Sequence, residues 1–284
     1  MDEPRLPSFL IIGAVKAATT WVSEQLRHHP ALWLPRTEPQ FFSTHFDRGL
    51  AWYRELFAKA PADRIIGEKS ADYLAHPEAA ARIAEALPGI PLIAQLRDPV
   101  ARAYSEYCML FRRGRVGGDL RRHLDPDHAA GQRFLEGGLY AKHIRRLTAR
   151  VDPARLKVIL YEAIRMDPEG VMREVCDHLA IARHIDTAAL ARTSNDSRSP
   201  MLPLPLRRVL RPARPLLDPL RTNAWLARMH KSMTRPVAYP PLTAALATKL
   251  REFYRRDIEE MEKLLDRDLS QWLQRDINLL RVGT

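Results

Sequence analysis

The sequence predicts an α/β fold in which a mostly parallel central sheet is flanked by helices on both faces. Short apolar segments rich in branched side chains alternate along the chain with longer segments of helical periodicity, which is the order typical of parallel sheets. The chain has 284 residues, of which 46% are hydrophobic and 28% are charged. A chain of this size and composition can bury a large core within one domain.

The expected elements follow one another in a regular order. The first apolar run, residues 8–12, stops at Gly13 and leads into a helical pattern over 19–27, so the chain opens with a strand, a tight loop and a helix. Further strands are expected at 31–34, 91–96 and 156–161. Further helices are expected at 50–58, 77–86, 99–113, 138–149 and 168–179.

We expect a single domain over residues 1–284 with three parts. The α/β core covers 5–197. In 198–241 prolines alternate with leucines and arginines, and we interpret this segment as a basic strap or lid across a surface, because its leucines need burial. Over 242–275 apolar residues recur every three or four positions, which predicts a long amphipathic helix in a C-terminal helical segment.

The formal net charge of +11 is concentrated in two segments. Residues 198–235 include nine basic residues and one acidic residue, and residues 112–122 include five arginines and one aspartate. These segments allow an alternative function, a non-catalytic protein that binds nucleic acid or an acidic membrane surface. They contain no nucleic-acid-binding motif and no continuous amphipathic helix, so we expect no nucleic-acid partner.

Cysteine, histidine and N-terminal patterns limit the class of protein further. Cys108 and Cys176 lie far apart, which supports neither a disulfide framework nor a zinc ribbon. The ten histidines show no HxxxH or HExxH spacing, and we expect no metal. The apolar run near the N-terminus is too short for a signal sequence or a membrane span. We therefore expect a cytoplasmic protein without a transmembrane segment, and the many alanines and arginines favour a bacterial source.

A candidate anion site follows the first expected strand. The residues Gly13 to Thr20, GAVKAATT, connect strand and helix, and such a loop directs backbone N–H groups and a helix N-terminus at one point. Lys16 and the hydroxyls of Thr19 and Thr20 add a charge and donors, so phosphate or sulfate is the expected ligand. The spacing differs from GxxxxGK[ST], which disfavours a kinase-like phosphoryl transferase and predicts a P-loop-like nucleotide-binding core of another kind. A plain strand–helix turn with an exposed lysine is the alternative.

Three further segments place polar side chains near the ends of expected strands. Arg97 follows the strand at 91–96, where open α/β sheets bind ligands, and Ser105 lies about two helical turns further on. RTEPQFF supplies Glu38, and GEKSADYL supplies Lys69. Together these residues resemble a nucleotide site with a base beside it.

Each of these residues also has a purely structural interpretation. Arg97 could form a salt bridge at the end of its strand, and Glu38 could face solvent from a turn. Lys69 could pair with Glu68 or Asp72 in a solvated surface cluster.

The order and the amino-acid sequences of these segments resemble those of the sulfotransferases that use 3′-phosphoadenosine 5′-phosphosulfate. The similarity is nearest to the heparan sulfate glucosaminyl N- and 3-O-sulfotransferase branch and its bacterial relatives. It covers most of the chain, through FLIIGAVKAATT, HPALWLPRTEPQFF, GLAWYRELF, GEKSADYL, LRDPVARAYSEY, LKVILYEAIRMDP and LREFYRRDIEEMEKLLDRDLSQWL. The resemblance implies metal-free transfer of a sulfuryl group to a hydroxyl or amine of a glycan or small metabolite.

The resemblance also implies roles for the matching residues. Lys16 stabilises the leaving nucleotide, Glu38 is the general base, and Lys69 is a second cation near the sulfuryl group. The 3′-phosphate is bound by Arg97 and Ser105, with Arg235 as a weaker candidate that closes over it. The implied donor-binding residues are Lys16, Ala17, Ala18, Thr19, Thr20, Trp21, Arg97, Ser105 and Arg235.

The chain departs from the family pattern at Ala18, where the family usually has a glycine before the threonine pair. If this position has a positive φ, alanine there costs about 1 kcal/mol. Outside the donor motifs, our hypothesis is that the basic segments at 112–122 and 198–235 flank the cleft. They would either attract an anionic acceptor or hold the nucleotide under a basic lid.

Overall fold

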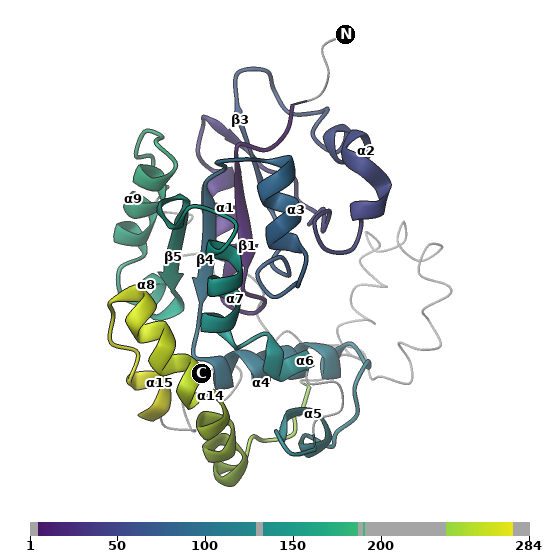
Figure 1. Cartoon of the computed structure of the whole chain (residues 1–284), viewed down its shortest axis with the longest axis vertical. Coiled ribbons are helices and arrows are strands. Elements are labelled where there is room, and N and C mark those ends of the chain that lie inside the picture. The colour runs from purple at the N-terminus through teal and green to yellow at the C-terminus, as the bar shows by residue number, and fades with distance from the viewer. Residues whose placement is uncertain (1–4, 129–132, 187–189, 191–236, 275–284) are drawn as a thin grey trace, which may run out of the picture.

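The computed structural model describes residues 5–128, 133–186, 190 and 237–274, and the predicted fold class is confirmed. Helices cover both faces of a five-stranded sheet with the order β2-β3-β1-β4-β5, and all of its pairings are parallel (Figure 1). Its strands are β1 (Phe9–Gly13), β2 (Leu32–Trp33), β3 (Ile65–Lys69), β4 (Leu92–Leu96) and β5 (Leu156–Leu160).

The strand order creates a ligand-binding position at the ends of β1 and β4. From β1 the chain moves to β2 and β3 on one side, and it then crosses to β4 and β5 on the other side. The loops after β1 and β4 therefore diverge to opposite sides of the sheet, and open α/β sheets bind ligands at such a reversal. Both strands are buried along their whole length, as expected for the centre of a parallel sheet.

Two hydrophobic clusters attach the helices to the two faces of the sheet. On one face Leu10 and Leu92 pack with residues of α2, α3, α4, α7 and α14. On the other face Ile11 and Ile93 pack with residues of α1, α8 and α9. The helices of the core are α1 (Thr19–Arg27), α2 (Gly49–Glu55), α3 (Ala79–Ala86), α4 (Pro99–Arg112), α5 (Arg121–Leu124), α6 (Arg133–Glu136), α7 (Tyr140–Thr148), α8 (Tyr161–Met166) and α9 (Pro168–His178).

Helix α4 starts directly at the end of β4. The Asp98 carboxylate accepts hydrogen bonds from the Val100 and Ala101 backbone N–H groups at 2.9 and 3.1 Å, and Pro99 occupies the first helical position. An aspartate cap followed by proline is a strong helix start. This start fixes the direction of the 14-residue helix that carries Ser105 away from the sheet.

The predicted C-terminal helical segment is present as α14 (Ala244–Leu265) and α15 (Gln271–Gln274). The buried face of α14 includes Leu250 and Tyr254 and packs against α7 and α4, and the Tyr254 hydroxyl donates to the Leu135 carbonyl at 2.9 Å. Residues 191–236, most of the predicted strap, lie outside the described residues, so the strap stays a prediction. Among the described residues, none of the helices combines the length and apolarity that a membrane crossing needs.

One strand was missing from the sequence-based prediction. We expected residues 67–74 to lie near strand ends, but Ile65–Lys69 forms β3, between β1 and β2. The prediction was wrong because Gly67, Glu68 and Lys69 give this segment little apolar character, although all three are buried. Side-chain hydroxyl groups that satisfy the Glu68 carboxylate make this polar strand possible.

Candidate active site

The loop after β1 is held in an uncommon backbone conformation. Gly13 has φ 146°, and two residues with side chains, Lys16 and Ala18, have φ 70° and φ 68°. The expected cost at Ala18 therefore applies, because its φ lies in the left-handed region. Ala18 is also the N-cap of α1 and provides no side-chain cap, so the N-terminus of α1 is open to an anionic ligand.

Cationic side chains surround this loop. Burial, followed by repulsion from Arg97 and Arg113, lowers the pKa of Lys16. Arg97 Nη1 donates to the Lys16 carbonyl at 3.4 Å, while its Nε is buried without a hydrogen-bond partner among the described residues. A bound anion would relieve this accumulation of positive charge.

Neighbouring aromatic residues fix Arg97. Its guanidinium carbon lies 4.6 Å from the centre of the Tyr161 ring, a cation–π distance. Its backbone carbonyl accepts a hydrogen bond from the buried Tyr140 hydroxyl at 2.9 Å. Arg97 therefore lies at the end of β4 as predicted. It contacts the loop, and it forms no strand-end salt bridge with any residue that the structure describes.

Arg113 was not among the predicted donor-binding residues, because the sequence placed it in the basic segment outside the donor motifs. It follows the end of α4, and its charge nevertheless acts on Lys16, 97 residues earlier. No local spacing signals this proximity, since it depends on the length and direction of α4. Ser105 lies half-buried on the same helix, and its pairing with Arg97 at a 3′-phosphate stays a prediction.

Lys69 joins the two sides of the site. Its ammonium lies 2.6 Å from Glu38 Oε1 and donates to Thr20 Oγ1 at 3.4 Å. The other carboxylate oxygen of Glu38 accepts the Ala71 backbone N–H at 3.1 Å. The structure thus brings three of the predicted segments together. It also contradicts the alternative of a surface cluster of Lys69 with Glu68 or Asp72. The Glu38 side chain is 34% exposed, so it does face solvent while its carboxylate pairs with Lys69.

The remaining predicted donor residues lie at the start of α1 or outside the described chain. Ala17 and Thr19 are buried, while Thr20 and Trp21 are half-buried in the first helical turn. Arg235 belongs to 191–236, outside the described residues, so its role stays a prediction.

A cavity of about 170 Å³ adjoins the loop. Ala14 and Val15 form part of its lining, and so do four of the residues that follow Lys69, namely Ala71, Asp72, Leu74 and Ala75. Arg102 and Glu106, which form a buried ion pair at 2.7 Å, also line it. The cavity therefore lies beside the segments that carry Lys16 and Lys69.

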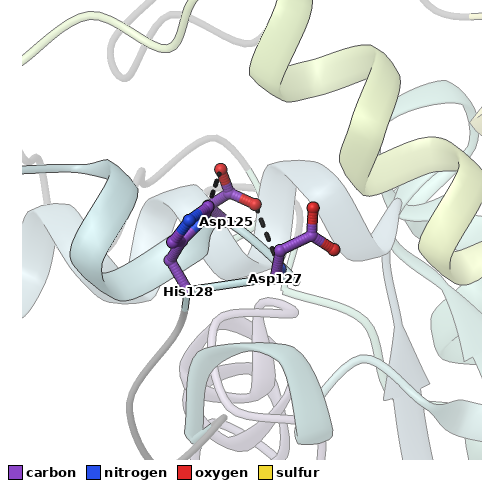
Figure 2. Close-up of side chains that lie close together, drawn as sticks. All are labelled: Asp125, Asp127 and His128. Atoms are coloured by element: carbon purple, nitrogen blue, oxygen red, sulfur yellow. Dashed lines mark hydrogen bonds and ion pairs between the residues drawn. The ribbon is translucent and has the colours of Figure 1, made fainter.

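A second group of polar residues lies near α5, where Asp125, Asp127 and His128 approach one another (Figure 2). Their ligand atoms lie within 4.8 Å of one another, as in a metal site. However, the Lys249 ammonium lies 2.6 Å from Asp125 and 2.5 Å from Asp127. Its hydrogen bond helps to lower the pKa of Asp125 to about 2. In the described structure this group therefore forms an ion-pair cluster with α14.

The fold and the loop define an α/β protein with a candidate anion site where the strand order reverses. Comparison with known proteins agrees, since the model of the Sulfotransferase family matches residues 45–185. Human heparan sulfate glucosamine 3-O-sulfotransferase 6 is 30% identical over 256 residues, which are 88% of this chain and 69% of that protein. The chain belongs to the sulfotransferase family.

Other relatives support the same assignment. Heparan sulfate glucosamine 3-O-sulfotransferase 3A1 of Mus musculus is 32% identical over 192 residues, covering 65% of this chain and 49% of the relative. The chain thus spans about half the length of several curated relatives that it matches. The sulfotransferase structure from Alicyclobacillus acidocaldarius superposes with a TM-score of 0.70 at 24% identity, covering 94% of this chain and 99% of that one, which shows the shared fold.

Proposed function

We propose that the chain transfers a sulfuryl group from 3′-phosphoadenosine 5′-phosphosulfate to a hydroxyl or amine of a glycan or small metabolite. The observation that carries the proposal is the position of Lys69, whose ammonium contacts both Glu38 and Thr20. The Lys69 side chain therefore contacts both the candidate base and the helix that follows the loop after β1. This is the arrangement that transfer between a bound anion and a neighbouring acceptor requires.

The cations of the site suit a donor with several negative charges. Lys16, together with the backbone N–H groups of 17–20, would hold the 5′-phosphosulfate at the open N-terminus of α1. Arg97 and Ser105 would hold the 3′-phosphate. The Arg97 Nε, buried without a hydrogen-bond partner in the described part of the chain, and the repulsion that lowers the pKa of Lys16 support this fit.

Lys16 and Glu38 would act on the two ends of the transferred group. As the bond between sulfur and the bridging phosphate oxygen breaks, Lys16 stabilises the negative charge that grows on that oxygen. As the new bond forms between sulfur and the acceptor atom, Glu38 takes the proton of the acceptor hydroxyl or amine. Lys69 holds the Glu38 carboxylate in position through the 2.6 Å ion pair.

A carbohydrate acceptor is the first class to test, because the names of the matched relatives describe them as heparan sulfate glucosamine sulfotransferases. The cavity next to residues 71–75 supports acceptor entry from that side. The exposed arginines of 112–122 would favour an anionic acceptor.

The proposed function is tested with sulfur-labelled donor and a panel of acceptors. The panel contains desulfated heparan oligosaccharides, an aminoglycoside and a simple phenol, and Lys16→Ala serves as the inactive control. We expect label transfer to at least one acceptor by the wild type and loss of transfer in the variant. Donor binding without transfer to any acceptor class, or equal transfer by Lys16→Ala, would contradict the proposal.

A further inference from the structure

Glu68 is a fully buried carboxylate that has no part in the proposed chemistry. It lies in β3 with no exposed surface, surrounded by the main hydrophobic cluster. Its two oxygens accept hydrogen bonds from Ser70 Oγ at 2.6 Å and from the Tyr53 hydroxyl at 2.9 Å. Burying a carboxylate is costly even with such partners, so its presence at this position calls for a specific role.

Ser70 and Tyr73 connect the surroundings of Glu68 to the segment that follows Glu38. Ser70 Oγ accepts the Gln40 backbone N–H at 2.8 Å, and the Tyr73 hydroxyl accepts the Phe41 backbone N–H at 2.8 Å. Two consecutive N–H groups of the segment with the candidate base are thus held by the segment after β3.

The backbone conformation at Gln40, the first of these two residues, is an unfavourable one. Gln40 has φ 49°, in the left-handed region, which is unfavourable for a residue with a Cβ. The hydrogen bond from its own N–H to Ser70 helps to keep it there. The Gln40 carbonyl accepts the backbone N–H groups of Thr44 and His45 at 2.8 and 3.1 Å, so the bond to Ser70 fixes the other backbone polar group of this residue.

We propose that Glu68 is a positioning residue for Glu38, acting through Ser70. A serine hydroxyl has one proton and two lone pairs. Because Ser70 donates its proton to Glu68, a lone pair of its oxygen is directed to the Gln40 N–H. The buried carboxylate therefore orients the acceptor that fixes the backbone two residues after the candidate base. This inference rests on the proposed role of Glu38 in sulfuryl transfer.

The structure offers a matched pair of variants. Ser70→Ala removes the hydroxyl between Glu68 and Gln40, whereas Tyr53→Phe removes a hydroxyl that also donates to Glu68 but bonds to neither Gln40 nor Phe41. The ring of Tyr53 stacks on Phe41 at 4.3 Å between centroids, a contact that phenylalanine keeps. Both variants remove one hydrogen bond to the same carboxylate, and they differ in the link to the Glu38 segment.

The experiment measures two properties of the full chain and of the variants Glu68→Gln, Ser70→Ala and Tyr53→Phe. Amide hydrogen exchange at Gln40 and Phe41 reports the local backbone, and kcat with donor affinity reports the reaction. For Ser70→Ala and Glu68→Gln we expect exchange at Gln40 to rise about tenfold and kcat to fall about tenfold, with donor affinity unchanged. For Tyr53→Phe we expect exchange and kcat to stay within about twofold of the wild type.

Unchanged exchange at Gln40 in Ser70→Ala would overturn the proposal, as would an equal effect of Tyr53→Phe. A wild type that transfers sulfuryl groups, with variants whose exchange rises but whose kcat is unchanged, would also overturn it while leaving the proposed function intact. If the wild type shows no transfer, the proposed function fails, and the role of Glu68 in positioning Glu38 for that reaction fails with it, while exchange at Gln40 still reports whether Ser70 fixes the backbone. If Glu68→Gln does not fold, the pair Ser70→Ala and Tyr53→Phe still decides the question.

Discussion

The two loops that meet at Lys69 are built in different ways. The loop after β1 contains left-handed Lys16 and Ala18, has no side-chain cap, and collects cations that repel one another. The segment after β3 is held by hydrogen bonds and by the ion pair of Lys69 with Glu38. On the donor side cations thus repel one another, while the base side is already assembled by the protein.

This difference indicates that the two sides contribute to binding and catalysis in different ways. On the donor side the ligand itself would supply the missing negative charge, so binding and catalysis there depend on charge complementarity. On the base side the protein fixes the reacting group in advance, and its contribution depends on position. Substitutions on the two sides should therefore have different signatures.

The largest effect is expected on the donor side, for Lys16→Ala. Removing the cation that stabilises the leaving oxygen should lower kcat on the order of 10²- to 10³-fold, measured by single-turnover transfer at saturating donor. The thermal midpoint should not fall, because burial and neighbouring arginines already disfavour the charge of Lys16, as its lowered pKa indicates. The exposed Lys59→Ala is the control. Near-normal turnover of Lys16→Ala would contradict the catalytic role of Lys16 on the donor side.

A comparable effect is expected on the base side, for Glu38→Gln. Loss of the general base should lower kcat about 10²-fold or more, with the affinity for 3′-phosphoadenosine 5′-phosphate unchanged. The exposed Glu55→Gln serves as the control. If Glu38→Gln weakened nucleotide binding and left kcat unchanged, the two sides would not be separate in function.

The buried network of the base side should show in the pH dependence of stability. Burial raises the pKa of Glu68 to about 7, above its ordinary value in the unfolded chain. Between these two pKa values the folded state holds a proton that the unfolded state has lost, so stability falls as pH rises toward 7. The free energy of unfolding of the wild type relative to Glu68→Gln should fall by roughly 3 kcal/mol between pH 4.5 and 8. Denaturant titrations at several pH values measure it, and a constant difference would contradict the account.

The smallest effect tests the strain of the donor loop. Because Ala18 has φ 68°, Ala18→Gly should raise the free energy of unfolding by about 1 kcal/mol. Ala17→Gly is the neighbouring control, since Ala17 is buried and lacks a positive φ, and it should lower stability. Urea titrations measure both variants. Equal changes in the two would mean that the loop is not strained at Ala18.

The sequence predicted best what depends on neighbouring residues. The strand, loop and helix around Lys16 and the turn from β4 into α4 are local, and apolar runs with Gly13 and Pro99 mark their ends. The ion pair of Lys69 with Glu38 was not predicted, because the sequence offered only the neighbouring Glu68 and Asp72 as partners of Lys69.

Strand β3, the network of Glu68 and the proximity of Arg113 to Lys16 were missed. The partners of Glu68 and Ser70 are distant in the sequence. Arg113 comes near Lys16 because of the length and direction of α4. Hydrophobic periodicity carries no information on such contacts, and a segment with two apolar residues among Ile65–Lys69 does not resemble a buried strand.

The central claim, that the donor side is completed by a 3′-phosphorylated nucleotide, is tested most directly by ligand-induced stabilisation. At 100 times its dissociation constant, 3′-phosphoadenosine 5′-phosphate should stabilise the wild type by about 2.7 kcal/mol. AMP at the same concentration should stabilise it far less, and Arg97→Ala should abolish the difference between the two nucleotides. Equal stabilisation of the wild type by 3′-phosphoadenosine 5′-phosphate and AMP would contradict the account.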